Sequence, residues 1–269
     1  MNIETQFYHM MLLVAAVVNI LIAVSLLHNN YWYRNYEVYH RSRRFVAITY
    51  VIFAIGFMMH YHFGWRVECP EAASALSVSY FHIAAVLFGW SHISLLRPNY
   101  LNSGIAARDF IILVVGLTAY WTSLPLADEY PELAIPGLTF AIFFAHAGYI
   151  AFTFYRTYFQ VRRDLIRMPA DSEAPYWWTP EAKHMVLKQQ HSFIISGHLI
   201  ILFGLGGIVF TALLPTAVWP YTLLLAMGIA VFIYIFYSLA SYGNVIESAC
   251  CATEDAVALR DKKKTIVNK

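Results

Sequence analysis

Long runs of apolar residues, separated by short polar segments, dominate the chain. An uncharged stretch of roughly 17 to 25 residues is long enough to cross about 30 Å of hydrocarbon as a helix. Seven such stretches occur, and Pro70, Pro98 and Pro131 lie in breaks between them. They are Phe7–Leu27, Phe45–Trp65, Ala72–Leu96, Phe110–Ala127, Leu133–Tyr155, Ser192–Leu214 and Val218–Tyr242. The pattern predicts an all-α polytopic membrane protein built as a bundle of seven transmembrane helices.

Composition supports this prediction and excludes other classes. Of the 269 residues, 59% are apolar and only 13% are charged, whereas soluble domains carry about a quarter charged residues. The formal net charge of +2 is too small for direct binding to nucleic acid. We therefore expect the protein surface to contact mainly the lipid bilayer.

The basic residues predict the orientation of the bundle. Cytoplasmic loops retain Lys and Arg, and every Lys and Arg except Arg66 falls after spans one, three or five, or in the tail. The N-terminus is therefore expected outside and the C-terminus in the cytoplasm. This reading gives a transmembrane domain over residues 1–242, which includes a cytoplasmic loop at 156–191, and a short cytoplasmic tail at 243–269.

None of the seven spans, as bounded above, carries Asp, Glu, Lys or Arg near its middle. Ionisable residues inside a membrane mark ion pathways and proton relays, because placing a charge there is costly. Their absence argues against an ion pump or a carboxylate-driven antiporter. A retinal protein is also excluded, since the last span has no lysine to form a Schiff base.

Histidines supply the candidate chemistry inside the spans. At a rise of about 1.5 Å per residue, His82, His146 and His198 fall at similar depth, and Tyr234 and Tyr237 could face a shared cavity. One interpretation is a ligand or cofactor layer, with haem b as the cofactor, because two inward-facing imidazoles at matched depth can ligate a haem. The other is that each ring and each hydroxyl bonds a neighbouring helix. The sequence leaves both open, and it leaves metal binding undetermined.

The loop at 156–191 is the largest segment predicted outside the membrane. Its basic first part continues the fifth span as an amphipathic helix, and prolines then surround a pair of tryptophans. Such a segment can lie on anionic lipid or present a docking surface. The candidate coupling residues are Arg156, Arg162, Arg163, Trp177 and Trp178. No catalytic loop motif occurs in the chain, so no enzymatic activity is expected.

Several short motifs carry a resemblance. Residues 42–45 (Ser-Arg-Arg-Phe) lead into residues 56–66 (Gly-Phe-Met-Met-His-Tyr-His-Phe-Gly-Trp-Arg), and residues 155–165 precede the tryptophan pair. Together with Ser94-Leu95-Leu96-Arg97 at the end of the third span, these motifs resemble a bacterial group of seven-helix membrane sensor modules. The resemblance implies a location in the bacterial inner membrane. Modules of that group precede a helix-turn-helix or kinase output domain, whereas this sequence ends about 27 residues after the seventh span.

The leading hypothesis is therefore an integral membrane sensor or signalling-associated protein. It would need no cofactor and would transmit ligand or partner binding to its cytoplasmic loop and tail, and from there to a separate cytoplasmic signalling protein. A homo-oligomer is compatible with this role. The alternatives are a b-type haem electron carrier that uses the intramembrane histidines, and a transporter for an uncharged solute.

Overall fold

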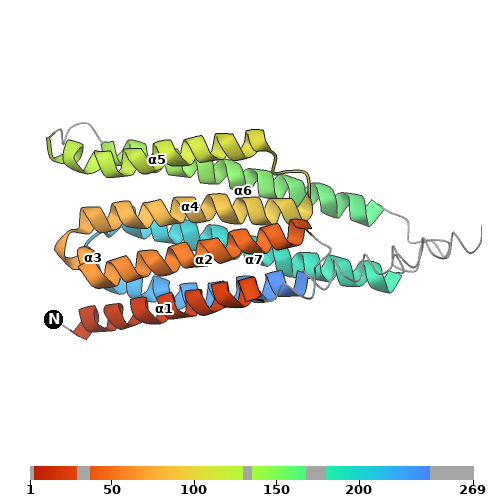
Figure 1. Ribbon diagram of the computed structural model, residues 1–269, viewed down its shortest axis with the longest axis horizontal. Helices are drawn as coiled ribbons and strands as arrows, with labels where there is room; N and C mark the ends of the chain where they lie inside the picture. The colour runs from red at the N-terminus through yellow and green to blue at the C-terminus, as the bar shows by residue number, and fades with distance from the viewer. Residues whose placement is uncertain (1–2, 29–36, 130–134, 168–179, 243–269) are drawn as a thin grey trace, which may run out of the picture.

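A computed structural model describes residues 3–28, 37–129, 135–167 and 180–242. Within these ranges the chain is helical and contains no strand (Figure 1). One four-residue helix, α3 (Trp65–Glu68), links two long ones. The long helices are α1 (Ile3–His28), α2 (Glu37–Phe63), α4 (Pro70–Leu96), α5 (Ser103–Glu129), α6 (Ile135–Arg167), α7 (Pro180–Leu213) and the last helix, Trp219–Tyr242. The all-α prediction is thus confirmed.

Six of these helices are long and apolar enough to cross a membrane. They are α1, α2, α4, the 103–124 part of α5, the 187–213 part of α7, and the last helix. The fifth long helix along the chain, α6, has 33 residues and lies alongside the others in Figure 1, but it is not among these six. The structure therefore supports a multi-pass membrane bundle.

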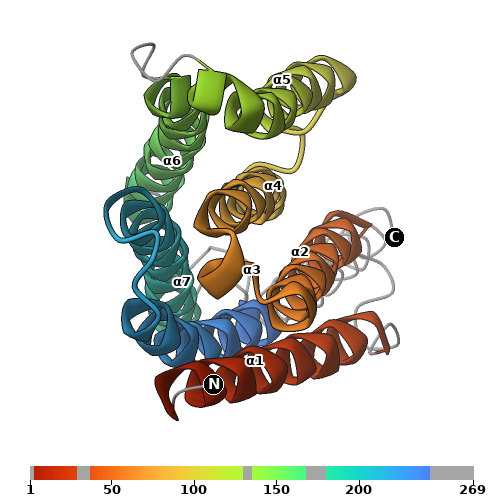
Figure 2. The same ribbon diagram turned by 90° about the vertical axis from the view of Figure 1, so that its left-hand side faces the viewer.

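The helix α4 forms the centre of the bundle. Figure 2 looks along the bundle and shows α4 surrounded by the others, and α4 packs against α2, α5, α6 and α7. Small residues allow this close approach: a Cβ added at Gly56 of α2 would lie 2.5 Å from Cδ1 of Tyr80 on α4. Close backbone approach at small residues is a usual way for membrane helices to pack, because lipid offers no hydrophobic drive for association.

Two tyrosines of α2 fasten it to the last helix. The hydroxyl of Tyr39 donates to the Leu239 carbonyl at 3.1 Å, and that of Tyr50 donates to the Phe232 carbonyl at 2.8 Å. Both tyrosines are buried. A buried hydroxyl needs a partner, so these bonds fix the register of two helices that are far apart in the sequence.

At one end of the bundle the chain turns sharply through Gly64 into α3. Gly64 has φ 61°, a left-handed conformation that glycine adopts without strain. The turn places Arg66, which is 1% exposed, so that its guanidinium donates to Ser77 Oγ at 2.9 Å and to the Pro215 carbonyl at 3.2 Å. Its charge also lies 3.8 Å from the centre of the Tyr221 ring. Arg66 thus joins α3, α4 and the start of the last helix at what we call the α3 end.

Several helices extend beyond the predicted spans. The helix α2 begins at Glu37 instead of Phe45, so three arginines assigned to a loop lie in its first turns, and Arg43 among them is buried and donates to the Leu26 carbonyl. The 156–191 loop is also largely helical, since α6 continues to Arg167 and α7 starts at Pro180. Hydropathy marks the apolar part of a helix and misses its polar ends, which explains both differences.

Candidate functional site

Two buried histidines are hydrogen-bonded to each other in the middle of the bundle. His82 of α4 is 0% exposed, and its Nε2 lies 2.9 Å from Nδ1 of His146 on α6. The structure therefore brings together two members of the predicted layer. Their direct contact ties the central helix to α6.

The bonds continue on both sides of the histidine pair. The Tyr120 hydroxyl of α5 lies 3.0 Å from His82 Nδ1, and His146 Nε2 lies 3.4 Å from Oδ1 of Asp109, also on α5. Tyr120 and Asp109 are both buried. We call Tyr120, His82, His146 and Asp109 the histidine chain.

Asp109 has further donors around it. Trp90 Nε1 donates to its Oδ2 at 2.8 Å, and the Arg108 guanidinium donates to Oδ1 through Nε at 2.9 Å and Nη2 at 2.7 Å. The side chain of Arg108 is 39% exposed and also donates to the Tyr149 hydroxyl at 3.0 Å. These donors and the positive charge favour the ionised carboxylate.

Asp109 changes the bounds predicted for the fourth span, which left this carboxylate outside it. The candidate span in α5 begins at Ser103, and Asp109 lies within it at 0% exposure. The apolar count had placed the start of this span at Phe110, one residue too late to include the carboxylate. The sequence did carry a signal for this site. Gly116 follows Asp109 by 7 residues and Tyr120 follows it by 11, so the three residues share one face of a helix.

Gly116 makes room for the histidine pair. A Cβ at this position would lie 2.8 Å from Cε1 and 2.9 Å from Nδ1 of His82. On the other side, the Phe143 ring stands edge-on to His82 at 5.5 Å between centroids. The imidazole is therefore held between α5 and α6 in a closely packed slot.

Tyr100, in the segment before α5, borders this region. It is buried, and burial raises the pKa of its phenol above the ordinary value, with the Asp109 charge acting in the same direction. Tyr100 therefore stays neutral beside Asp109 and Arg108.

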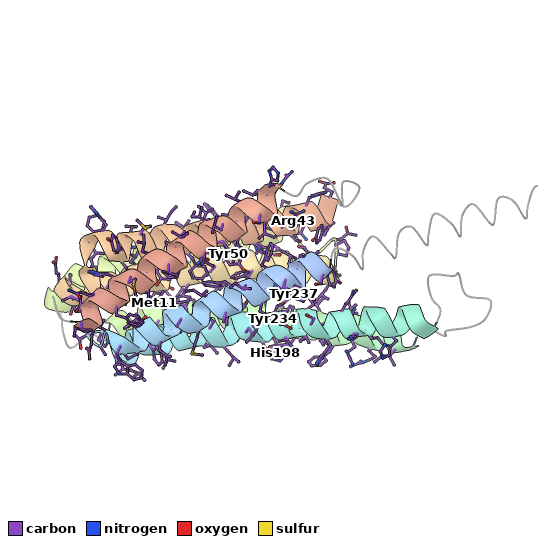
Figure 3. The ribbon with its side chains drawn as sticks, turned by 90° about the horizontal axis from the view of Figure 1, so that it is seen from below. Met11, Arg43, Tyr50, His198, Tyr234 and Tyr237 are labelled. Carbon is purple, nitrogen blue, oxygen red and sulfur yellow. The ribbon has the colours of Figure 1, made fainter. Side chains whose placement is uncertain are left out.

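The other members of the predicted layer lie elsewhere (Figure 3). His198 of α7 bonds the Ile194 carbonyl of its own helix at 2.7 Å, and its ring lies 5.2 Å from that of Tyr155. Tyr234 bonds Ser192 at 3.2 Å, which joins the last helix to α7. Tyr237 is 64% exposed. These three residues make no described bond to the histidine chain.

The predicted coupling surface lies partly on described helix. Arg156 and Arg163 are exposed on α6, and Arg162 donates to the Tyr158 hydroxyl at 3.1 Å. Trp177 and Trp178 lie outside the described residues. In Figure 1, α6 and α7 project beyond the other helices at the end opposite α3.

The histidine pair does not fit a haem between its rings. Two metal–nitrogen bonds of about 2 Å would hold the coordinating nitrogens roughly 4 Å apart, on opposite faces of a macrocycle, whereas His82 Nε2 and His146 Nδ1 are 2.9 Å apart and bonded to each other. Within the described residues, no group of three His, Cys, Asp or Glu side chains is arranged to hold a metal ion. The geometry of this histidine pair therefore gives no support to the haem alternative, which stays a prediction.

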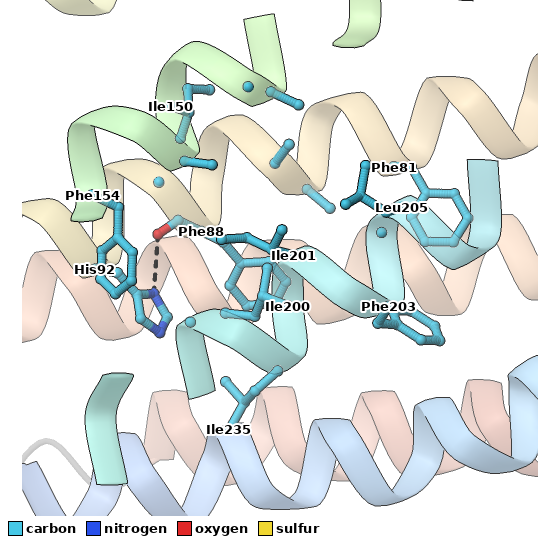
Figure 4. Close-up of a pocket in the computed structure, with 18 of the residues that line it drawn as sticks. Phe81, Phe88, His92, Ile150, Phe154, Ile200, Ile201, Phe203, Leu205 and Ile235 are labelled. Atoms are coloured by element: carbon cyan, nitrogen blue, oxygen red, sulfur yellow. Dashed lines mark hydrogen bonds between the residues drawn. The ribbon is translucent and has the colours of Figure 1, made fainter. Parts of the chain in front are cut away.

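A large apolar cavity lies beside the histidine chain. It has a volume of about 320 Å³ and is lined by α2, α4, α6, α7 and the last helix. Figure 4 shows Phe88, Ile150, Ile200 and Ile201 around it. Among the described residues that line the cavity, His92 has the one polar side chain. Its Nδ1 bonds the Phe88 carbonyl at 3.0 Å, the dashed line in the figure.

The cavity reaches the surface between α6 and α7. Its lining includes Phe144 of α6 and Leu205 of α7, which are 39% and 40% exposed, and these two helices make few direct contacts with each other. Sequence reasoning missed this cavity, because an apolar lining residue looks like any other apolar residue in a membrane helix. Comparison of the chain with protein-family models, with curated proteins and with solved structures finds no match.

Proposed function

We propose that this protein is a membrane sensor that binds an apolar ligand between α6 and α7. The observation that carries the proposal is the cavity of about 320 Å³, which is open towards the surface between the two helices that project furthest from the bundle. Its volume lies at the lower end of the range of about 300–1,000 Å³ for small-molecule sites. A binding site joined to the projecting helices is what a sensor of this kind requires.

The proposal includes a topology of seven crossings, in which α6 joins the six candidate spans. The distribution of Lys and Arg supports an external N-terminus and α3 end, and a cytoplasmic C-terminus. The sensor would lie in a bacterial inner membrane, as the resemblance of its motifs implies. The projecting ends of α6 and α7 would then lie in the cytoplasm.

The lining indicates the class of ligand. Phenylalanine, alanine, isoleucine and glycine surround the cavity, and His92 is the one polar side chain among the described lining residues. A hydrocarbon chain or a flat apolar ring with at most one hydrogen-bonding group suits such a site. Because lipid tails are as apolar as the cavity, shape and van der Waals contact must select the ligand, and not the hydrophobic effect.

Ligand binding would be transmitted through the position of α6 relative to α7. These helices contact each other little and each packs on α4. A ligand between them would therefore contact them differently when they lie close together and when they lie further apart. A ligand shifts such an equilibrium only by its difference in affinity for the two arrangements. The exposed Arg156 and Arg163 on α6 would present the change to anionic lipid or to a cytoplasmic signalling protein.

Filling the cavity tests this proposal. Gly148 and Gly204 both line it, and nothing lies within 4 Å of a Cβ built on either one. Gly148→Leu and Gly204→Leu therefore place a side chain in empty space. Leu202→Trp is the control, because Leu202 is 64% exposed on α7 and is not among the lining residues.

The assay uses the full chain in lipid nanodiscs with parinaric acid, a fluorescent fatty acid, as the probe. We expect the native protein and Leu202→Trp to bind the probe saturably, and both glycine variants to lose binding. Spin labels at Arg163→Cys on α6 and Lys188→Cys on α7, with the native cysteines changed to serine, should report a shift in distance on binding. Saturable binding that survives in both leucine variants, or a distance that does not change when the probe is bound, would refute the proposal.

A further inference from the structure

The histidine chain runs along the middle of the candidate span in α5. Asp109 and Tyr120 are both on α5, and their eleven-residue separation corresponds to about 16 Å along the helix. The candidate span in this helix, Ser103–Leu124, has 22 residues, or about 33 Å. The chain therefore covers the middle half of the span and leaves about 9 Å beyond Asp109 and about 6 Å beyond Tyr120.

The hydrogen-bond donors in this chain all point the same way. Asp109 accepts from Arg108 and Trp90, so the ionised carboxylate can only accept the bond from His146 Nε2. That bond places a hydrogen on Nε2 and leaves Nδ1 of the neutral ring as an acceptor for His82 Nε2. By the same reasoning His82 Nδ1 accepts from the Tyr120 hydroxyl. Tyr120 thus donates to His82, His82 donates to His146, and His146 donates to Asp109, which only accepts.

We propose that the histidine chain conducts protons across the middle of the membrane, from Tyr120 to Asp109. A chain of aligned donors and acceptors can pass a proton by handing one along each bond. An ionisable residue within a span is a mark of such pathways. The proposal is independent of the ligand cavity.

Each step moves one proton and no electrons. Tyr120 passes its hydroxyl proton to His82 Nδ1 while its oxygen takes up a proton from water entering at the α3 end. His82 passes the proton on its Nε2 to His146 Nδ1, and His146 passes the proton on its Nε2 to Oδ1 of Asp109. Tyr120 and both imidazoles end with the same number of protons as before, and Asp109 becomes a carboxylic acid.

Release of the proton occurs at the Arg108 end. The Arg108 side chain is 39% exposed and bonds Asp109 directly, so water at this surface can approach the carboxyl group. A second passage requires both imidazoles to return to the Nε2–H form. The longest link, 3.4 Å between His146 and Asp109, is the one that must shorten for transfer.

The titratable and charged groups around the chain come from all the elements packed against it. In the described residues they are His82 on α4, Arg108, Asp109 and Tyr120 on α5, His146 and Tyr149 on α6, and Tyr100 in the preceding segment. Arg108 and Asp109 balance each other in charge, so the chain as a whole is close to neutral before a proton enters. That balance lowers the cost of keeping the chain inside a membrane.

Vesicles that contain the full-length protein test the proposal. A potassium gradient with valinomycin sets the voltage, and pyranine trapped inside reports the internal pH. We expect protein-containing vesicles to acidify faster than protein-free ones. Tyr120→Phe removes only the first donor and His146→Leu removes the middle link, so both should reduce the rate to that of protein-free vesicles.

Tyr50→Phe is the matched control. Tyr50 is also buried, and its hydroxyl donates to the Phe232 carbonyl, outside the histidine chain. We expect this variant to conduct like the native protein. A native rate no higher than that of protein-free vesicles, or a Tyr120→Phe rate equal to the native one, overturns the proposal. Because Tyr120→Phe removes a single oxygen, it remains decisive even where His146→Leu fails to fold.

Discussion

Two glycines on α7, three residues apart, should respond to the same substitution in opposite ways. Gly204 lines the cavity and has nothing within 4 Å of a built Cβ, whereas a Cβ on Gly207 would lie 2.5 Å from Cε2 of Phe81 and closer still to Cζ. Ordinary contact between carbons is about 3.5 Å or more. Gly207→Ala therefore requires the Phe81 ring to move by roughly 1 Å.

The expected difference in the free energy of unfolding comes from a packing cost that only Gly207→Ala has. Alanine favours a helix over glycine by up to about 1 kcal/mol through the backbone, and this gain applies to both positions. Gly207→Ala adds an overpacking cost of about 1–3 kcal/mol, because Phe81 is itself held by Phe53 and Phe203 at 5.7 and 5.6 Å between ring centroids. Gly207→Ala should thus be about 1–3 kcal/mol less stable than Gly204→Ala, and Gly204→Ala should be at least as stable as the native protein.

Reversible unfolding in mixed micelles of a mild detergent and dodecyl sulfate measures this difference. The helical content that persists in the denatured state affects both variants alike, so the comparison isolates packing. Equal stabilities, or a more stable Gly207→Ala, would refute the description of α4 and α7 as closely packed at Phe81.

Three further predictions concern the ends of the bundle and the surroundings of the carboxylate. Arg66→Ala should lower the free energy of unfolding by at least about 1–3 kcal/mol, because the buried guanidinium donates to the Tyr221 hydroxyl at 3.1 Å and covers its ring; an unchanged unfolding midpoint would contradict this. Trp90→Phe should lower the free energy of unfolding by about 1.5–3 kcal/mol in the same assay, since it removes a donor from the charged Asp109. An unchanged free energy of unfolding would show that Arg108 and His146 satisfy the carboxylate without Trp90. Cys69 is exposed and should react with a membrane-impermeant maleimide on intact cells once the two tail cysteines are changed to serine, while labelling only after lysis would reverse the proposed orientation.

The apolar pattern predicted the class of fold because the membrane leaves few alternatives. A backbone in hydrocarbon must satisfy its own hydrogen bonds, so long apolar runs form helices. The ends of the helices were less predictable, since the polar first turns of α2 and α7 carry residues that also occur in loops. Depth, computed from the helical rise, placed His82, His146 and His198 in one layer, but depth alone could not show that His82 contacts His146 while His198 lies against Tyr155.

Asp109 and the cavity show two different limits of such reasoning. Asp109 was assigned to a loop because hydropathy penalises a charge without asking whether Trp90 and Arg108 will satisfy it. The cavity depends on the spacing of helices from distant parts of the sequence, and no local pattern encodes an empty volume. The setting of Asp109 depends on tertiary contacts among α4, α5 and α6, and the cavity depends on contacts among α2, α4, α6, α7 and the last helix.

The central position of α4 also constrains how the protein can be made. Its buried face carries Ser77, His82, Ser91 and His92, and the helices that cover His82 and His92 follow it in the chain. During synthesis α4 would leave the translocation channel before α6 and α7 exist, with His82 and His92 facing lipid. Retention of α4 at the channel until its later neighbours emerge would spare that exposure, so biogenesis should depend on the second half of the nascent chain.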